Sequence, residues 1–374
     1  MDYTQLIDST LHWISGLQTP NGALTMYPIR KAGDSSKICT YFSEFAGLAL
    51  LLKPDTYGEC VRRYMDWHMS RMNSSETDYN GEDGTVYDYT STLLDDGTYQ
   101  EEIVIDPATG GPLYDSTDSY AALFLHLLYE YVEATGDVGY IVQHRLEAGR
   151  TVRAMLCTMD KGLSWAKPDY KVKYLMDNCE VYRGVCSAEK LYSQIYLPNS
   201  FNDIDIADAK KQIEMLIELK KSLFDAIESI LWNPKEEFYY VGAMEERKGI
   251  PESIDWKVFY PDALAQLFPV VMDLLAADHP RSVYLYEKFN QNFSNEETAW
   301  EEMRGENLGT HFINGLITYT AAKMGDNRRV VSFLETYLST IVNKRYPFPA
   351  FIADCAQVAL AADILRKNER RNEK

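Results

Sequence analysis

The chain has 374 residues, of which 46% are hydrophobic and 25% charged, and its formal net charge at pH 7 is −19. These proportions are ordinary for a globular protein. The acidic charge argues against nucleic acids and anionic membranes as partners, because both attract basic surfaces.

Amphipathic helical periodicity begins near the N-terminus, where a first helix is predicted over residues 2–17. The second predicted helix, 41–52, is apolar on nearly every side. The third, 55–73, again has one apolar and one charged face. The fourth, 116–135, is rich in small and apolar residues, and the fifth, 137–158, returns to a charged outer face. This alternation predicts solvent-facing helices that take turns with buried ones.

The same alternation continues through the second half of the chain. Apolar or small-residue helices are predicted over 179–197, 261–275, 305–324 and 350–367. The helix predicted over 203–232 is strongly charged, and two more polar helices separate the remaining buried ones. We therefore expect about twelve helices, with the even-numbered ones forming an inner layer.

The connectors between these helices are alternately short and long. Two short ones, Thr135-Gly136-Asp137 and Met324-Gly325-Asp326, combine a helix-ending glycine with an aspartate that can cap the next helix. A third, Lys53-Pro54-Asp55, places proline at a helix start. The long connectors are 18–40, 74–115, 159–178, 233–259, 294–304 and 344–349.

Helices joined in this way form hairpins, and a closed ring of hairpins gathers all the long connectors at one end. The predicted fold is therefore all-α: one domain over residues 1–374, built as an (α/α)6 toroid of six helical hairpins. Alternating residues at 85–90 and 238–241 predict small β-hairpins over the mouth of the pocket. An α-solenoid would also contain helical hairpins, but no fixed repeat period is visible.

Four short segments resemble the six-hairpin glycosidases, which include glucoamylase-like and glycogen-debranching enzymes. They are Tyr114–Ala122 (Tyr-Asp-Ser-Thr-Asp-Ser-Tyr-Ala-Ala), Asp177–Tyr182 (Asp-Asn-Cys-Glu-Val-Tyr), Tyr260–Pro269 and Tyr346–Pro349. The resemblance implies an (α/α)6 barrel that binds carbohydrate at the end carrying the long loops.

Glycoside hydrolysis requires two carboxyl groups, one acting as an acid and the other as a base or nucleophile. Asp115 and Asp118 rank first because their spacing places both on one face of a helix start, and Glu180 is the choice for the second carboxylate. Helix capping is an equally strong alternative for the pairs Asp115/Asp118 and Asp177/Glu180. The other acidic candidates at the loop end are Asp83, Asp88, Asp177, Asp262, Glu301 and Glu302.

Aromatic rings that can stack on sugars are frequent in the long loops, although each is as well suited to loop packing. Asp88, flanked by two tyrosines, is either a substrate ligand or a solvated hairpin residue. The predicted substrate-binding residues are Tyr27, Tyr87, Asp88, Tyr114, Trp165, Asp177, Tyr182, Trp256, Tyr260 and Asp262.

The sequence contains no motif for a metal or an organic cofactor, so neither is expected. The six histidines form no H-E-x-x-H pattern, and the six cysteines form no C-x-x-C pair. Unpaired cysteines inside helical patterns and an N-terminus that lacks the regions of a secretory signal favour a cytoplasmic protein.

The function predicted from these observations is a glycoside hydrolase acting on oligosaccharides. By resemblance, an inverting mechanism is expected, in which the second carboxylate activates water. A non-catalytic carbohydrate-binding or assembly protein on the same scaffold remains an alternative. A sugar epimerase is a weaker alternative. Epimerases with this fold resemble proteins that carry several histidines in the pocket, and this sequence is poor in histidine.

Overall fold

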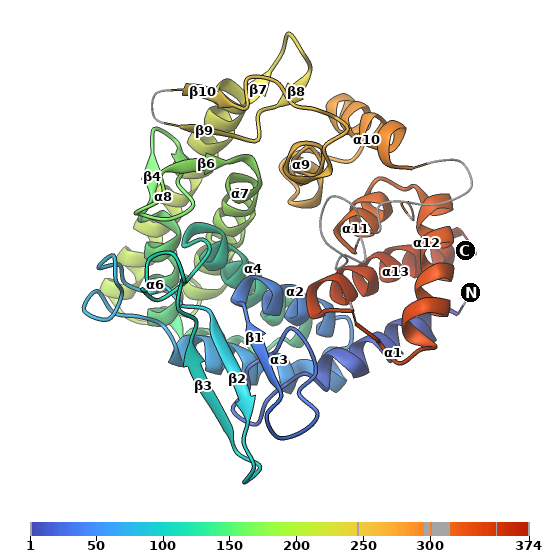
Figure 1. Cartoon of the computed structure of the whole chain (residues 1–374). Coiled ribbons are helices and arrows are strands. Elements are labelled where there is room, and N and C mark those ends of the chain that lie inside the picture. Colours follow the sequence, from blue (N-terminus) through green and yellow to red (C-terminus); the bar gives the residue numbers. More distant parts are fainter. Residues whose placement is uncertain (1, 245–246, 295–299, 301–314, 349, 373–374) are drawn as a thin grey trace.

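The computed structural model describes residues 2–244, 247–294, 300, 315–348 and 350–372. Within these ranges, the helices form two concentric layers around a closed ring (Figure 1). In the inner layer each helix packs against the next around the ring, and the last helix packs against the first. The inner helices in ring order are α2 (Thr40–Leu50), α4 (Asp118–Thr135), α7 (Leu175–Lys190), α9 (Phe268–Val271), α11 (Gly315–Lys323) and α13 (Ile352–Asn372).

The outer layer consists of helices that alternate with the inner ones along the chain. They are α1 (Tyr3–Ser15), α3 (Pro54–Ser70), the short α5 (Val138–Gln143) followed by α6 (Arg145–Leu156), α8 (Asp203–Ala226), α10 (Pro280–Phe293) and α12 (Asn327–Tyr337).

Burial separates the two layers as the sequence pattern predicted. Every residue from 118 to 129 in the inner helix α4 is buried, whereas α8 in the outer layer buries only Ala209, Leu216, Leu223 and Ala226. An outer helix has one face in contact with the inner layer and the other in solvent, while an inner helix is covered on both sides. The predicted all-α toroid is therefore confirmed.

The short connectors work as predicted. Gly136 adopts a left-handed conformation with φ of 71° after α4, and the side chain of Asp137 accepts a hydrogen bond from the backbone of Tyr140 at the start of α5. Gly325 has φ of 75°, and Asp326 caps α12 in the same way. Glycine and aspartate thus end one helix and begin the next within two residues.

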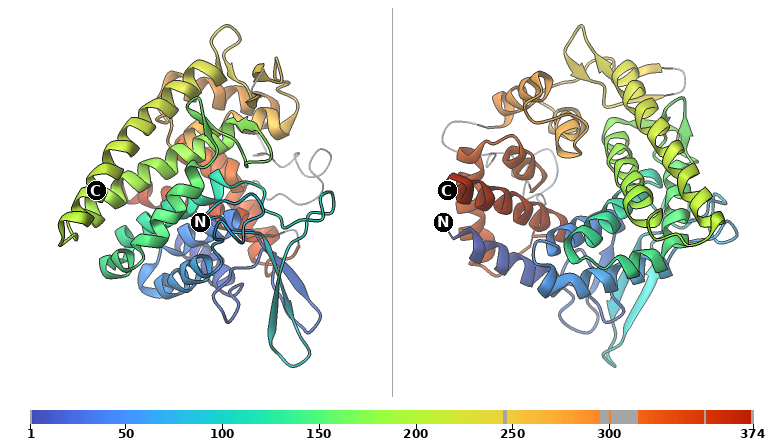
Figure 2. Two further views of the ribbon diagram at one scale, coloured as in Figure 1. Left: turned by 90° about the vertical axis from the view of Figure 1, so that its left-hand side faces the viewer. Right: turned by 180° about the vertical axis from the view of Figure 1, so that it is seen from behind.

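The long connectors carry the strands and lie together at one end of the ring (Figure 2). β1, β2 and β3 form one antiparallel sheet, and β6, β9 and β10 form a second. The remaining four strands form two small hairpins. The strands are β1 (Ser35–Ile38), β2 (Tyr89–Leu93), β3 (Tyr99–Ile103), β4 (Met159–Asp160), β5 (Leu163–Ser164), β6 (Val172–Tyr174), β7 (Trp232–Asn233), β8 (Phe238–Tyr239), β9 (Gly242–Met244) and β10 (Arg247–Ile250).

Some predicted boundaries are wrong. The segment 85–90 is irregular until Tyr89, and its strand pairs with Tyr99–Ile103. The helix predicted to start at residue 179 starts at Leu175, so Asp177 and Glu180 both lie inside it. The helix predicted over 261–275 is interrupted, and α9 within it has only four residues, with Pro269 in the first turn, where its missing N–H is tolerated. Residues 305–314 of another predicted helix lie outside the described residues.

π-Helical turns follow three of the described helices, and a fourth precedes α9. These turns are Leu191–Tyr196 after α7, Ile227–Leu231 after α8, Phe259–Ala263 before α9 and Leu338–Val342 after α12. The predicted helices 179–197 and 203–232 therefore end close to where they were expected. None of the described helices is both long and apolar enough to cross a membrane.

Candidate active site

The first turns of the inner helices lie at the end of the ring where the long connectors arrive. Asp118 is the first residue of α4 and is fully buried. Its Oδ1 accepts hydrogen bonds from the Ser116 hydroxyl at 2.6 Å and the Ser119 backbone N–H at 2.8 Å, and its Oδ2 accepts one from the Ser164 hydroxyl. Burial raises the pKa of Asp118 to about 6, although these hydrogen bonds oppose the rise.

Glu180, on the neighbouring helix α7, has a carboxyl group that is only 2% exposed. The hydroxyl of Tyr41, in the first turn of α2, donates to its Oε1 at 2.7 Å. Burial raises the pKa of Glu180 to about 8; hydrogen bonds from Tyr41 and Ser119 oppose the rise, and the negative charge of Asp118 adds to it. This carboxyl group therefore holds its proton at neutral pH.

Asp177 lies one helical turn before Glu180 and is partly exposed. Burial raises the pKa of Asp177 well above its usual value, and the negative charges of Asp118 and Glu180 raise it further. Two carboxyl groups this close do not both ionise easily, so they titrate as a pair. Asp115 is exposed on the loop before α4, and its charge acts on Asp177, Glu180 and Tyr260.

The loop end of α4 and α7 thus contains a carboxylate cluster, which we define as Asp115, Asp118, Asp177 and Glu180. The structure brings together the three predicted catalytic residues and adds Asp177 to them. Neither pair forms the predicted capping box, although the Asp118 carboxylate does accept the backbone N–H of Ser119 in the first turn of α4. Thr117 precedes α4 and Asp115 lies outside the helix, while Asp177 is the third residue of α7.

Asp88 is fully buried beside this cluster and is not the solvated hairpin residue of one prediction. The Lys37 ammonium lies 2.6 Å from its Oδ2, and the Tyr120 hydroxyl donates to its Oδ1 at 3.1 Å. Burial raises the pKa of Asp88, while the Lys37 charge lowers it. Asp88 therefore joins the strand β1, through its ion pair with Lys37, to the inner helix α4, through its hydrogen bond from Tyr120.

Two of the predicted stacking residues, Tyr87 and Tyr114, are buried within the loop that precedes α4. Their rings stack at 5.4 Å between centroids, and Tyr79 stacks on both. The Tyr87 hydroxyl donates to the Thr77 carbonyl at 3.1 Å. Packing within the loop accounts for both rings, because each is at most 2% exposed.

The other predicted binding residues are distributed unevenly. Tyr260 is 52% exposed and lies beside the carboxylate cluster. Tyr27 lies near Asp354, in the first turn of α13. Burial raises the pKa of Tyr27, and the negative charge of Asp354 raises it further. The Lys171 ammonium lies over the Trp165 ring at 4.4 Å. Trp256 is half-buried against the core.

Three other candidates contact residues outside the carboxylate cluster. Tyr182 faces Phe224 of the outer helix α8, on the side of α7 away from the cluster. Asp262 accepts a hydrogen bond from the backbone N–H of Asp255 at 2.8 Å. Asp83 is paired with Arg150 and Arg153. Glu301 and Glu302 lie outside the described residues.

Sequence reasoning missed Tyr41 and Glu44. Both lie on α2, and Glu44 is fully buried with His68 Nδ1 at 3.6 Å from its Oε1. Burial raises the pKa of Glu44 well above its usual value, and the charge of Glu180 adds to the rise. A single glutamate in an otherwise apolar helix was the available signal. Among the described residues, no group of three or more His, Cys, Asp or Glu side chains is placed to hold a metal ion.

No protein-family model and no curated protein sequence matches this chain. Solved structures do match it in fold. A GH76 α-mannanase from Bacteroides thetaiotaomicron superposes with a TM-score of 0.57 at 11% identity, over 100% of this chain and 98% of that one. A sugar epimerase from a ruminal bacterium has a TM-score of 0.55 at 11% identity, over 98% and 99% of the two chains.

A rhamnosidase from Klebsiella oxytoca is a third structure of this kind. Its TM-score is 0.57 at 11% identity, and the match covers 96% of this chain. The chain spans only 64% of the length of that rhamnosidase. These similarities confirm the six-hairpin fold, which glycosidases and an epimerase share. At such low identity they carry no residue roles.

Proposed function

We propose that this protein is a carbohydrate-active enzyme that hydrolyses glycosidic bonds in oligosaccharides. The observation that carries the proposal is the carboxylate cluster, in which Asp177 and Glu180, both with a raised pKa, lie beside the exposed Asp115. Glycoside hydrolysis needs a proton donor and a second carboxylate across the scissile bond. The fold, which solved glycosidases share, supports the same reaction class.

The Asp177–Glu180 pair supplies the acid in this proposal. Its raised pKa keeps a proton available near neutral pH, and Asp177 is the member of the pair that is exposed enough to reach a leaving oxygen. Asp115 is the partner carboxylate, which activates water in an inverting reaction. Its exposure on the loop before α4 leaves room for that water.

Asp118 is better suited to positioning than to chemistry. Both of its oxygens already accept hydrogen bonds, from Ser116, Ser119 and Ser164, and the side chain is fully buried. Asn178 continues this network, because its Oδ1 accepts from the Ser164 backbone N–H at 2.8 Å. The network fixes the first turn of α4 against α7, where the reacting carboxyl groups lie.

The test is release of sugars from a panel of α- and β-linked oligosaccharides, measured in parallel for the wild type and for variants. Glu180→Gln, Asp177→Asn and Asp115→Asn are each expected to lower kcat by about 10²–10⁴-fold. Asp95→Asn, in the exposed turn between β2 and β3, is the matched control and should retain full activity. The anomer formed first, observed by NMR, distinguishes inversion from retention.

Each alternative function has its own outcome in the same experiment. Binding of an oligosaccharide without turnover would replace the proposal with a non-catalytic carbohydrate-binding protein. Conversion of a free sugar to its epimer, without hydrolysis, would replace it with an epimerase. Full activity in all three variants would remove the carboxylate cluster from the mechanism.

We further propose that the protein works in a reducing compartment such as the cytoplasm, on imported oligosaccharides. All six cysteines are unpaired, and Cys39, Cys179 and Cys355 are buried as small apolar residues. No disulfide holds the loops around the candidate site, which supports folding without an oxidising environment.

A further inference from the structure

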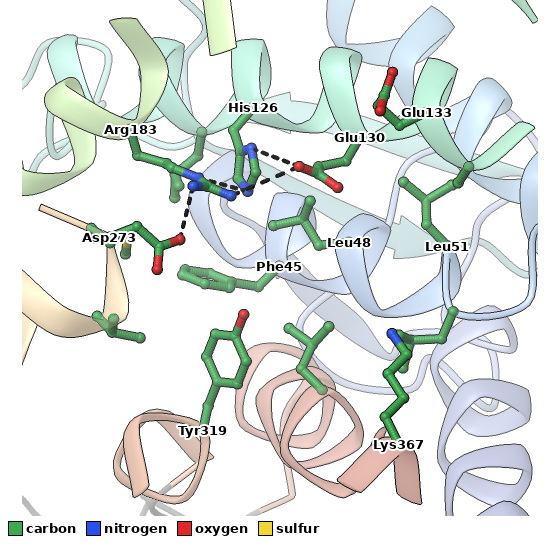
Figure 3. A pocket seen from close by; sticks show the side chains of 16 residues that line it. Phe45, Leu48, Leu51, His126, Glu130, Glu133, Arg183, Asp273, Tyr319 and Lys367 are labelled. Carbon is green, nitrogen blue, oxygen red and sulfur yellow. Dashed lines mark hydrogen bonds and ion pairs between the residues drawn. The ribbon is translucent and has the colours of Figure 1, made fainter. Parts of the chain in front are cut away.

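A cavity lies at the opposite end of the ring from the carboxylate cluster, around the C-terminal halves of the inner helices, and Figure 3 shows the side chains that line it. Its volume is about 370 Å³, within the range of small-molecule sites. The residues that line it come from all six of the inner helices described above or from the turns that end them. The cavity therefore lies on the axis of the ring, where the inner helices end.

One wall of this cavity is a polar network centred on Arg183 of α7. The Nη1 of Arg183 lies 2.8 Å from Oδ2 of Asp273, and its Nε donates to Nε2 of His126 at 3.3 Å. The Nη2 of the same guanidinium is 3.8 Å from Oε1 of Glu130, which is longer than a hydrogen bond. Figure 3 shows these side chains converging on one side of the cavity.

His126 holds this network in place. Because Arg183 donates to Nε2, the proton of the neutral ring is on Nδ1, which lies 3.1 Å from the Ser187 hydroxyl. Burial lowers the pKa of His126 well below its usual value, and the nearby positive charges of Arg183 and Lys323 lower it further. The imidazole therefore stays neutral and fixes the direction of the guanidinium.

An adjoining wall is apolar and comes mainly from α2, which packs against α4. Phe45, Leu48 and Leu51 line it, and Leu48 is half-buried. The Tyr319 hydroxyl of α11 points into the space beneath Phe45 in Figure 3. An apolar wall beside a wall of hydrogen-bonding groups suits a ligand with one C–H face and one hydroxylated edge.

The charges around the cavity balance. Glu130, Glu133 and Asp273 are the acidic groups of the lining, and Arg183 and Lys367 are the basic ones. Lys323 adds a third positive charge, since its Nζ donates to Asp273 Oδ1 at 2.5 Å. Because the opposite charges are paired, a small ion would gain little binding energy from them. A hydroxyl group placed between Arg183 Nη2 and Glu130 Oε1 can accept from the first and donate to the second.

We propose that this axial cavity is a second binding site, which takes a neutral polyhydroxylated molecule of monosaccharide size. The ligand's hydroxyls lie against Arg183, Glu130 and the Tyr319 hydroxyl, and its C–H face lies against Leu48 and Phe45. The site is separate from the carboxylate cluster and does not depend on whether that cluster hydrolyses glycosidic bonds.

The probes are D-glucose, D-mannose, D-galactose and L-rhamnose, with inorganic phosphate and methylammonium as charged comparisons. Binding is measured by calorimetry and located by hydrogen–deuterium exchange, in the wild type and in Glu180→Gln, whose change lies in the other site. We expect at least one sugar to bind Glu180→Gln and to protect residues 123–134 and 268–275 from exchange.

Leu48→Trp is the blocking variant, because its indole fills the cavity without removing a polar group. It should weaken sugar binding at least tenfold, and Arg183→Lys, which keeps the charge but removes Nη2, should also weaken it. Leu146→Trp, at an exposed position of α6, is the control and should bind as the wild type does. Melting curves establish that each variant is folded.

Three outcomes would overturn the proposal. The first is that none of the four sugars binds. The second is protection confined to the first turns of α4 and α7, with Leu48→Trp binding normally, which would place the sugar at the carboxylate cluster alone. The third is that only phosphate or methylammonium binds, which would make the ligand an ion. Hydrolytic activity is measured separately, so its failure leaves these outcomes unchanged.

Discussion

Buried carboxyl groups give the loop end of this protein its chemical character. Glu180, Asp118 and Glu44 are buried and Asp177 is partly buried, and burial is the largest cause of the raised pKa of every one of them. Such groups are costly to ionise, so a fold retains them where a proton is to be moved or a polar network fixed. Tyr41 adjusts this balance through one hydrogen bond to Glu180.

Loss of the Tyr41 hydroxyl should move the alkaline limit of activity. That hydroxyl donates to the Glu180 carboxylate and lowers its pKa, so Tyr41→Phe should raise the pKa. The acid acts in its protonated form, so activity falls as pH rises through about 8 in the wild type and at higher pH in the variant. The pH profile of kcat/KM measures this shift. Tyr182→Phe, which faces α8, should leave it unchanged.

Replacing Glu180 by glutamine should stabilise the protein at alkaline pH. A carboxyl group whose folded pKa is raised contributes stability fully below its unfolded pKa, near 4.3, and loses that contribution as pH rises through about 8. Glutamine does not titrate, so Glu180→Gln should be more stable than the wild type by up to about 5 kcal/mol at pH 9 and by little at pH 4. Urea unfolding at the two pH values tests this. If the variant and the wild type differed equally in their free energy of unfolding at both pH values, the effect would not arise from ionisation of Glu180.

Close packing between neighbouring inner helices decides where these carboxyl groups meet. At Gly184 of α7, an added Cβ would lie 2.6 Å from the Cα of Ala122 in α4. Gly47 of α2 is similarly close to Leu127, and Gly315 of α11 to the backbone of Asp354 in α13. Small residues at these seams let the inner helices approach closely enough for Asp118, Asp177 and Glu180 to interact.

A methyl group at the α4–α7 seam should therefore disturb both stability and the site. Gly184→Ala is expected to destabilise the fold by about 1–3 kcal/mol, because backbone atoms of Ala122 must move. Gly149→Ala on α6, whose nearest neighbour is 3.6 Å away, should instead be neutral or gain up to about 1 kcal/mol from helix propensity. Chemical denaturation compares the two. A stable Gly184→Ala would mean that the seam tolerates a wider separation.

The closed ring links all the inner helices into one packed structure. α13 packs against α1 and α2 at one side and against α11 at the other, so the last helix of the chain completes contacts with the first ones. The two ends of the ring then differ. The inner helices begin at the carboxylate cluster and end around the axial cavity with its Arg183 network.

If the ring is a single domain, as we propose, it should unfold in one transition. Gly184→Ala and Gly315→Ala alter seams in different parts of the ring, and both should lower the midpoint of the same transition. Scanning calorimetry should give equal calorimetric and van't Hoff enthalpies for each. A second transition that only Gly315→Ala shifts would divide the chain into separate folding units.

Local patterns in the sequence were enough to predict the architecture. Helical periodicity, glycine–aspartate junctions and the alternation of apolar with charged helices depend on residues close together in the chain, so they are legible without the fold. They placed the inner helices and the end that carries the loops. They failed where a local pattern was ambiguous, as at Pro269 and at 85–90.

Only the tertiary structure decided which side chains meet. Tyr41 and Glu180 are 139 residues apart, and no pattern within either segment specifies the other. The sequence identified Asp115, Asp118, Asp177 and Glu180 as one group of acids. Only the structure shows that Asp115 is exposed to solvent whereas Asp118 is fully buried. Burial and hydrogen bonding between helices set the proton affinity of each group, and both arise only when the ring closes.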